Sequence, residues 1–233
     1  MFVRKIMIDD VVSVPDNATL DEARAVMEAR RLRAVPVVHE GRPVGVLELL
    51  ELHRLGVGHP SPEAPGTRLV SALMQPAPPT VTPDTPFEEA AARMAGQTVS
   101  FLPVVDDRGL LVGVVTRDAL FRQMLHLLGW DRPDIPRLAL LVPEQPGQVE
   151  RIGRTVREMG GNITHMATDR SETFGLYTLL LRIQVGDFDR LVEALERQGF
   201  RTLDRSHPAS ARPVSAGSDG DGAGADQSPE RGA

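Results

Sequence analysis

The fold is decided by the stretch SVPDNATLDEARAVMEARRLRAVPVVHEGRPVGVLELLEL at residues 13–52, because it recurs at residues 81–120 as VTPDTPFEEAAARMAGQTVSFLPVVDDRGLLVGVVTRDAL. Within these stretches Met27 corresponds to Met94, at a spacing of 67 residues. Self-similarity at a fixed spacing is the mark of a repeated structural unit. The sequence therefore predicts two copies of one unit in the first half of the chain.

Each copy has the pattern of a β-α-β-β-α unit. A short strand comes first, and the helix after it is predicted by the capping-box spacing of Thr19 with Glu22 and of Thr85 with Glu88. Two β-rich runs around a turn and a second helix complete the unit. A unit of this size leaves one face of its sheet uncovered, so we expect the two copies to pack together.

A different order follows in residues 138–205. A strand and a turn lead to a helix that stops at the two glycines 160 and 161; two strands, a helix that ends at Gly199 and a last strand come next. This is the βαββαβ order of ferredoxin-like domains. The predicted fold class is α+β, with a tandem β-α-β-β-α pair of α/β type followed by a βαββαβ domain.

The predicted boundaries are residues 1–58 for the first copy, 59–129 for the second, 130–137 for a linker and 138–205 for the third domain. Residues 206–233 consist mainly of Pro, Ala, Ser, Gly and Asp. Such a composition cannot bury enough apolar surface to offset the entropy cost of ordering, so we expect a disordered tail.

Composition excludes several classes of function. The 233 residues include no cysteine, which removes thiolate chemistry, and a net charge of −6 argues against nucleic acid or anionic membranes as partners. No apolar run approaches the length of a membrane span, so we expect a cytoplasmic protein. The six histidines lack metal-ligand spacing and no catalytic motif is present. We expect a protein that is not an enzyme and holds neither a metal nor a cofactor.

The two copies resemble a pair of CBS domains, and residues 138–205 resemble an ACT domain, whose strand-turn-helix motif appears here as VPEQPG at residues 142–147. The order of the three modules is similar to that of the AcuB-type acetoin-utilisation regulators. The resemblance to CBS pairs implies a cleft for an adenosyl ligand: AMP, ADP, ATP or S-adenosylmethionine. The resemblance to ACT domains implies a small effector, usually an amino acid, at a dimer interface.

These resemblances imply a regulatory ligand sensor that forms a homodimer and acts on an unknown regulated protein. The alternative is an interaction scaffold, in which both clefts are degenerate and the modules only hold a partner enzyme or transporter.

The CBS pattern usually has a hydroxyl residue that faces phosphate and, three positions later, an Asp that binds the ribose diol. Thr116 fits the first position, but Ala119 stands at the second and Asp118 comes one residue early. Thr116 either meets a phosphate at a helix start or is a plain N-cap. By the resemblance, the candidate nucleotide-binding residues are Arg33, Glu51, Thr80, Thr82, Ser100, Val114, Thr116, Asp118 and Ala119.

The first copy has Glu48 and Glu51 at the two positions of this pattern. A carboxylate at Glu48 would repel phosphate, while Glu51 either holds a ribose diol or belongs to a degenerate site. Arg33, whose counterpart in the second copy is Ser100, is either a phosphate contact or part of a solvated helix end. Thr80 and Thr82 are similarly either strand residues or ligand contacts.

In the ACT-like part, Glu144 stands where the family usually has Asp. The N–H groups at the following helix start could hold a ligand carboxylate, unless the domain serves only to dimerise. The candidate effector-binding residues are Glu144, Gly147, Gln148, Val149 and Asn162.

Overall fold

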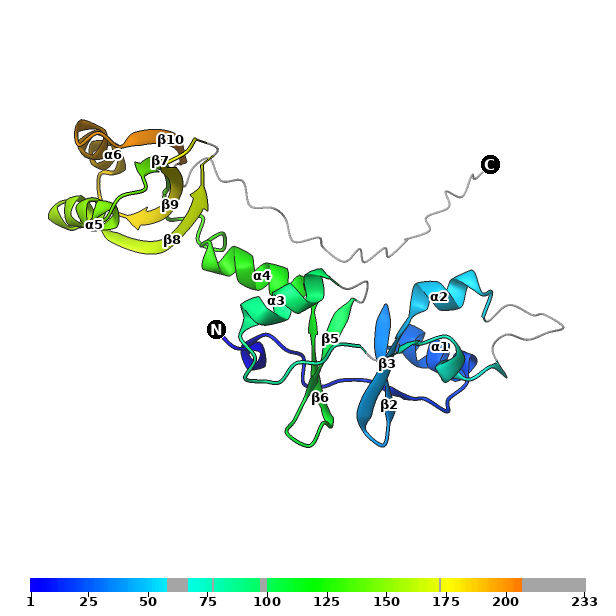
Figure 1. The fold of residues 1–233 in the computed structure, drawn as a ribbon. Helices are drawn as coiled ribbons and strands as arrows, with labels where there is room; N and C mark the ends of the chain where they lie inside the picture. Colours follow the sequence, from blue (N-terminus) through cyan, green and yellow to red (C-terminus); the bar gives the residue numbers. More distant parts are fainter. Residues whose placement is uncertain (58–66, 77, 97–99, 172, 207–233) are drawn as a thin grey trace, which may run out of the picture. The chain divides into compact units, whose positions relative to one another are not determined.

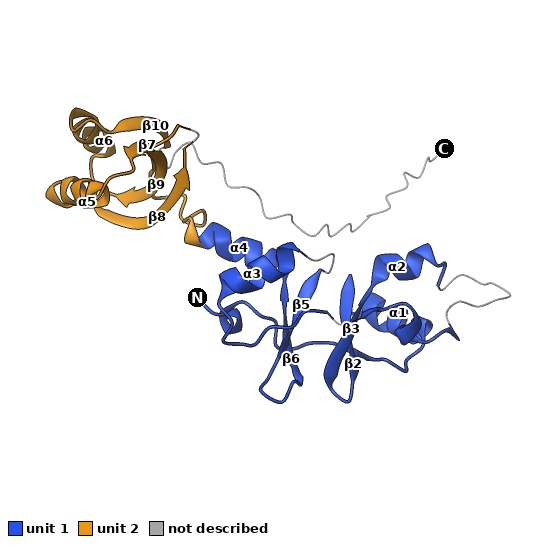
Figure 2. Ribbon diagram, viewed as in Figure 1, with its two compact units in different colours: residues 1–126 blue, residues 127–233 orange. Residues whose placement is uncertain are grey.

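The structure, a computed structural model, describes residues 1–57, 67–76, 78–96, 100–171 and 173–206. The chain divides into two compact units, Met1–His126 (unit 1) and Leu127–Ala233 (unit 2), which Figure 2 distinguishes by colour. A disordered tail is predicted for residues 206–233. Ser206 instead ends the last strand of the chain's described part, and residues 207–233 lie outside the described residues.

The first repeat of unit 1 contains β1 (Val14–Pro15), α1 (Leu20–Ala29), β2 (Ala34–His39), β3 (Arg42–Glu48) and α2 (Leu49–Arg54) (Figure 1). Strand β1 pairs in parallel with β2, and β2 pairs antiparallel with β3. Glu40 and Gly41 join β2 to β3 with φ angles of 48° and 77°. Two consecutive positive φ angles are typical of the type I′ turn that matches the twist of a hairpin.

The capping box predicted for α1 is confirmed. The N–H of Glu22 donates to Thr19 Oγ1 at 3.2 Å, and the N–H of Thr19 donates to Glu22 Oε2 at 2.8 Å. Each side chain thus satisfies a backbone donor that the first helical turn leaves unpaired.

The second repeat contains α3 (Phe87–Ala95), β5 (Phe101–Val105), β6 (Leu111–Thr116) and α4 (Arg117–Leu127). The opening strand is reduced to a parallel bridge between Val81 and Val104. The capping box predicted for Thr85 and Glu88 is wrong. Pro86 is in an extended conformation and is itself the N-cap, so α3 begins one residue later than predicted. The hydroxyl of Thr85 instead accepts the N–H of Thr82 at 2.9 Å.

Two segments are exchanged between the repeats. Near the N-terminus, η1 (Val3–Lys5) lies in the core of the second repeat, and Ile8 forms an antiparallel bridge with Val114 of β6. Correspondingly, η3 (Val70–Ala72) lies in the core of the first repeat, and β4 (Gln75–Pro76) pairs with β3. Each repeat is therefore completed by the segment that precedes the other one in sequence.

The repeats also pack against each other. Val46 of β3 belongs to the buried cluster of the second repeat, and Ala34 of β2 packs against that cluster. The tips of the two hairpins meet as well, because the N–H of Leu111 donates to the carbonyl oxygen of Gly41 at 2.9 Å. The expected packing of the two copies against each other is confirmed.

Unit 2 has the predicted βαββαβ order: β7 (Arg137–Pro143), α5 (Gln148–Glu158), β8 (Asn162–Arg170), β9 (Leu176–Gln184), α6 (Phe188–Arg197) and β10 (Arg201–Ser206). The strands form one antiparallel sheet in the order β10-β7-β9-β8. Alternate strand residues such as Leu140 and Leu181 form a core with Ile152 of α5 and Leu191 of α6. The helices thus cover one face of the sheet (Figure 1).

Candidate functional site

The two strand-to-helix junctions of unit 1 are built alike. The N–H of Leu49, at the start of α2, donates to the carbonyl oxygen of Arg33 at 2.8 Å. The N–H of Arg117, at the start of α4, donates to the carbonyl oxygen of Ser100 at 3.2 Å. These bonds make the position of Glu48 equivalent to that of Thr116.

One junction reaches across to the other repeat. The hydroxyl of Ser100, just before β5, donates a hydrogen bond of 2.8 Å to Oε1 of Glu48 at the end of β3. The sequence places these two residues 52 positions apart, yet both belong to the pattern that predicts a nucleotide cleft. On this side of unit 1 the carboxylate is already engaged by a hydroxyl donor.

Thr116 caps helix α4. Its Oγ1 accepts the N–H of Ala119 at 3.1 Å, which is the contact of an N-cap. A hydroxyl has two acceptor lone pairs and one donor proton, so the proton of Thr116 stays available to a further acceptor. The capping interpretation is confirmed, and it leaves the phosphate interpretation open.

The three other candidates near α4 differ in exposure. Ala119 is buried in the core cluster of the second repeat, whereas Asp118 is exposed to solvent. Val114 uses both of its backbone groups in hydrogen bonds of 2.8 and 2.9 Å with Ile8. Val114 therefore serves the sheet. Ala119 packs against the core and also lines a cavity of about 270 Å³ with Arg122 and His126, whereas Asp118 lies on the surface.

Thr80 and Thr82 are tied into the start of the second repeat. The carbonyl oxygen of Thr80 accepts Nη1 of Arg93 at 2.7 Å. The hydroxyl of Thr82 lies 3.1 Å from that of Thr85. The contacts of both residues are internal to the second repeat.

Glu51 and Arg33, the candidates in the first repeat, differ in whether their charge is already paired. Glu51 forms an ion pair of 2.7 Å with Arg54 on α2. Arg33 is exposed, and within the described part of the chain its guanidinium has neither a hydrogen bond nor an ion pair. Arg33 is therefore the cation of this set that is available to an anion.

A cavity of about 430 Å³ in unit 1 lies at the start of the first repeat. Its lining includes Ser13, Asn17 and Glu22 but none of the candidate residues. Sequence reasoning gave no signal for it, because its lining combines residues of the segment before α1 with one face of that helix.

The candidate effector residues of unit 2 surround the turn between β7 and α5. Gly147 has a φ of 86° and is the N-cap of α5, a left-handed conformation that favours glycine. The side chain of Gln148 is buried and accepts Nη1 of Arg151 at 3.1 Å, while Val149 is exposed. Glu144, also exposed, forms an ion pair of 3.8 Å with Arg170.

Asn162 does not join this group. It pairs with Gln184 at one end of the sheet, whereas Pro143, just before the turn, pairs with Leu176 at the other end of β9. The nine residues of β9 separate the two ends by roughly 27 Å at about 3.4 Å per residue. The structure therefore separates Asn162 from Glu144 and Gly147.

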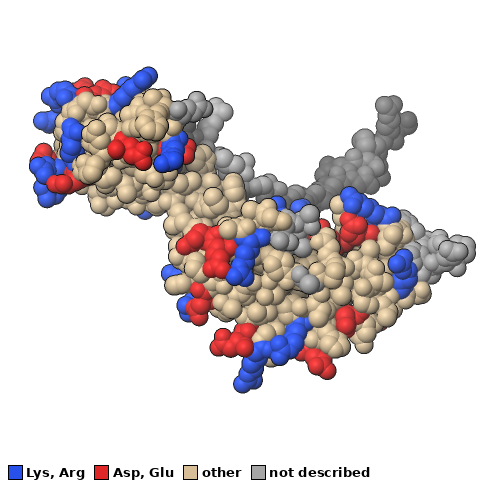
Figure 3. Space-filling view, viewed as in Figure 1, with Lys and Arg blue, Asp and Glu red and all other residues tan. Residues whose placement is uncertain are grey.

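Charges of both signs lie side by side on the face of the protein shown in Figure 3, with no extended patch of one sign. Among the described residues no group of three or more His, Cys, Asp or Glu could hold a metal ion. Within the same residues, no helix combines the length and the apolar character that spanning a bilayer requires.

Comparison with known proteins gives matches in the first half of the chain. The CBS domain family matches residues 3–57 and 70–126. A CBS domain-containing protein of Dictyostelium discoideum is 31% identical over 137 residues, which are 55% of this chain and 94% of that protein. The magnesium transporter MgtE of Thermus thermophilus is 37% identical over 144 residues, covering 56% of this chain and 30% of the transporter.

The extent of the match differs among relatives. The chain spans only 24% of the homoserine O-acetyltransferase of Methanohalobium evestigatum, at 28% identity over 52% of this chain. Among solved structures, CBSX2 in complex with AMP has a TM-score of 0.46 and 25% identity, covering 54% of this chain and 97% of CBSX2. Both matched segments lie in unit 1, and the Dictyostelium relative is covered almost completely. The chain therefore belongs to the family of CBS domain proteins and carries two copies of that domain.

Proposed function

We propose that this protein is a regulatory ligand sensor of the cytoplasm that catalyses no reaction: unit 1 binds an adenine nucleotide, and unit 2 is an ACT domain that dimerises and binds a small effector. The observation that carries the nucleotide site is the equivalence of the two junctions. Glu48 of one junction contacts Ser100 of the other repeat. Because Thr116 corresponds to Glu48 and Arg33 corresponds to Ser100, we expect Thr116 to lie opposite Arg33.

This pairing favours a phosphate. Thr116 offers a hydroxyl proton at the start of α4, where the helix dipole favours anions. Arg33 offers a guanidinium, which binds phosphate oxygens bidentately. On the equivalent side, the carboxylate of Glu48 repels a phosphate. We therefore expect one nucleotide per chain.

The ribose contact is assigned to Asp118, because it is exposed while Ala119 is buried. Ala119 is only 8% exposed, so a carboxylate introduced there would be largely buried, and burying a charge is costly. Glu51 is engaged by Arg54, which supports a degenerate site in the first repeat.

The test is calorimetric titration with AMP of the wild type, Arg33→Leu and Thr116→Asp. Asp is as good an N-cap as Thr, so Thr116→Asp should keep the melting temperature while its charge repels phosphate. We expect each variant to weaken binding at least about tenfold, the scale of one charge-assisted hydrogen bond. Arg30→Leu is the matched control, because Arg30 is an exposed cation three residues away.

If Arg33→Leu and Thr116→Asp both bind AMP with unchanged affinity, the phosphate does not bind between these two residues. Absence of any AMP binding, together with no rise in melting temperature with ADP, ATP or S-adenosylmethionine, would favour the scaffold that holds a partner enzyme or transporter. The bond between Ser100 and Glu48 supports that second candidate, because it closes one side of unit 1 without a ligand.

For unit 2, the proposed effector site comprises Glu144, Gly147, Gln148 and Val149, without Asn162. Its support is the left-handed Gly147, which is the N-cap of α5 and provides no side-chain cap for the first N–H groups of the helix. Unit 2 has two edge strands, β8 and β10, and an edge strand invites pairing with a second copy. Sedimentation at micromolar concentration should give a dimer, and a monomer alone would contradict this part of the proposal.

A further inference from the structure

Unit 2 contains a cavity of about 210 Å³ that none of the residues proposed above lines. It lies on the sheet face away from α5 and α6. Leu179 and Leu181 of β9 point to the helices, so Leu180 and Arg182, which alternate with them and line the cavity, point to the opposite face.

The segment just before β7 forms a second wall, and Arg182 holds it in place. The guanidinium of Arg182 donates three hydrogen bonds of 2.8 to 3.3 Å to backbone carbonyls of this segment, those of Leu128, Arg132 and Ile135. Gly129 also fits closely, because a Cβ there would come within 2.6 Å of Arg182 Cδ and 2.7 Å of His165 Nδ1. The cavity is therefore shaped before a ligand arrives, which lowers the ordering cost of binding.

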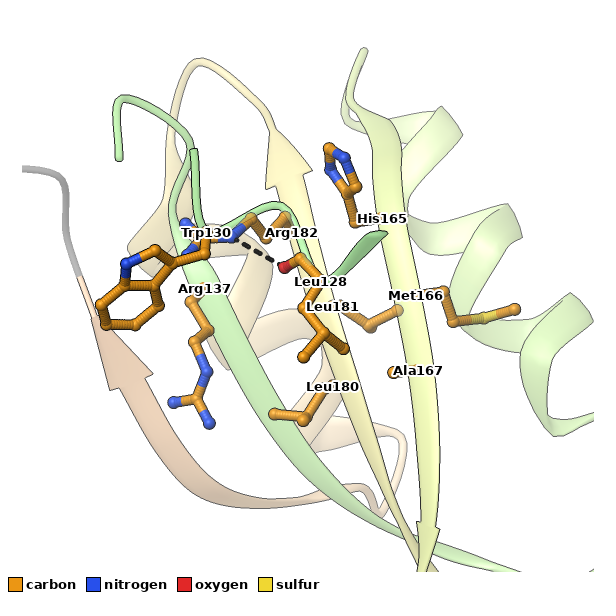
Figure 4. Close-up of a pocket in the computed structure, with 9 residues that line it drawn as sticks. All are labelled: Leu128, Trp130, Arg137, His165, Met166, Ala167, Leu180, Leu181 and Arg182. Atoms are coloured by element: carbon orange, nitrogen blue, oxygen red, sulfur yellow. Dashed lines mark hydrogen bonds between the residues drawn. The ribbon is translucent and has the colours of Figure 1, made fainter. Parts of the chain in front are cut away.

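The lining combines hydrocarbon with basic groups. In Figure 4, Trp130 and Arg137 lie on one side of Leu180, and Ala167 and His165 lie on the other. The side chain of Met166 points away from the rest. The lining residues include two arginines and a histidine but no acidic residue. Such a lining is complementary to an anion with an apolar body.

Donors remain for that anion. Arg182 Nη2 has no hydrogen bond to any described residue. Trp130 Nε1 has none either, and in Figure 4 it lies on the edge of the indole away from Leu180. Arg137 forms an ion pair with Asp204, which leaves other N–H groups of its guanidinium unused. Arg182 is 9% exposed, and burial together with the nearby Arg137 lowers its pKa.

Size and charge narrow the class of ligand. Pockets for drug-sized molecules measure about 300–1,000 Å³, so this cavity is too small for a nucleotide. An ammonium group would find no carboxylate in the lining itself, because Asp204 lies beside the cavity and is paired with Arg137. We propose that the cavity binds a small monocarboxylate with an apolar body and no ammonium group, at a site separate from both sites proposed above.

The test uses the fluorescence of Trp130, which is the only tryptophan of the chain and lines the cavity. The full chain is titrated with 4-methylpentanoate, with leucine and with 4-methylpentan-1-ol, three molecules with the same carbon skeleton. We expect a saturable change with the carboxylate, and binding at least about tenfold weaker for the amino acid and the alcohol.

Two variants locate the binding. Arg137→Leu removes a cation and Ala167→Leu fills the cavity, and each should weaken binding of 4-methylpentanoate at least about tenfold. Arg205→Leu is the matched control, because Arg205 is an exposed arginine of β10 that pairs with Asp189 at 3.4 Å away from the lining. Melting temperatures show whether each variant folds, and Ala167→Leu keeps the test valid if Arg137→Leu does not fold.

Three results would overturn the inference. The first is a Trp130 fluorescence that does not saturate below roughly 1 mM 4-methylpentanoate, and the second is equal affinity for the alcohol. The third is a fluorescence that changes with protein concentration and not with ligand concentration. The last would show that a second copy covers this face. AMP titration of the same protein is independent of these three results, so a negative result with the carboxylate does not contradict the proposed nucleotide site.

Discussion

Arg31 follows the C-cap residue of helix α1, Arg30, and lies in the left-handed region of the backbone with a φ of 52°. The N–H of Leu32 donates to the carbonyl oxygen of Met27 at 2.7 Å, and that of Arg31 donates to Glu28 at 3.1 Å. These are the two bonds of a Schellman motif, in which the left-handed position usually holds glycine. An arginine there carries a steric cost that glycine lacks.

Arg31→Gly should therefore raise the free energy of unfolding by about 0.5–1 kcal/mol, measured by urea denaturation. The matched control is Arg30→Gly, which removes the same charge one residue earlier, where φ is −102°. That variant should destabilise the protein, because glycine only adds entropy to the unfolded chain at a position with ordinary backbone angles. Equal effects of the two variants would contradict the explanation.

The capping carboxylate of Glu22 should make the stability of the protein depend on pH. Hydrogen bonds from the backbone N–H and then the hydroxyl of Thr19 favour its carboxylate form and lower its pKa from the ordinary 4.5. Its contribution to stability is thus complete above pH 4.5 and is lost as the pH falls through the lower pKa of the folded state.

Between about pH 6 and about pH 3, the wild type should lose more stability than Glu22→Gln, followed by thermal melting at each pH. Glu88→Gln is the control, since Glu88 has the equivalent position in the second repeat and α3 has no capping bond from a side chain. If Glu88→Gln reduces the loss of stability at low pH as much as Glu22→Gln does, the loss comes from general charge repulsion and not from the capping box.

Among the elements, β9 shows how a strand can hold a neighbouring segment in place. Arg182 lies between Leu181 and Ile183, which are both in the core, and the strand alternation turns its guanidinium to the other face. The only sequence signal for this role is an arginine inside an apolar strand. Its three carbonyl partners come from a segment more than 40 residues earlier, and no sequence pattern specifies them.

Arg182→Met should keep the hydrocarbon packing but lose these bonds, including a buried one to Ile135 at 2.8 Å. We expect a loss of about 2–4 kcal/mol in the free energy of unfolding, because hydrogen bonds from a charged donor contribute about 1.5–3 kcal/mol each and some of these are partly exposed. Arg197→Met, which removes one exposed bond of 3.3 Å to the carbonyl oxygen of Glu193, should cost less than about 0.5 kcal/mol.

The two capping boxes show how far element prediction reaches. Thr19 and Glu22 satisfy each other locally, so the sequence pattern was sufficient. Thr85 and Glu88 have the same spacing, but Pro86 stays extended and shifts the helix start. At the site, Thr116 is recognisable as a hydroxyl before a helix, whereas the contact of Glu48 with Ser100 depends on packing between repeats.

In unit 1 as a whole, the exchange of segments is the feature that sequence comparison of the repeats did not predict. Repeat similarity reports which residues are alike, not which copy each segment joins. Val3 is fully buried in the second repeat, and its N–H donates to the carbonyl oxygen of Thr85 at 2.9 Å. The N-terminal residues are therefore structural parts of a repeat that begins about 70 positions later.

Deleting residues 1–8 should destabilise the second repeat more than the first. Burial of Val3 alone contributes roughly 1.5–3 kcal/mol, and the backbone bonds of Ile8 with Val114 add to it. We expect melting to fall by at least roughly 5 °C and hydrogen exchange to rise in β5 and β6 more than in β2 and β3.

Deleting residues 207–233 serves as the comparison and should leave melting unchanged, because that composition has few apolar residues to pack. Faster exchange confined to β2 and β3 after the N-terminal deletion would contradict the exchange of segments.

The exchange has a consequence for synthesis on the ribosome, where the N-terminus emerges first. Ile8 meets its partner Val114 only after about 100 more residues have been made, which at roughly 5–20 residues per second takes roughly 5–20 s. During that time Val3, Ile6 and Met7 have no core to enter. The nascent chain therefore presents a short apolar segment that chaperones can hold until translation has passed β6.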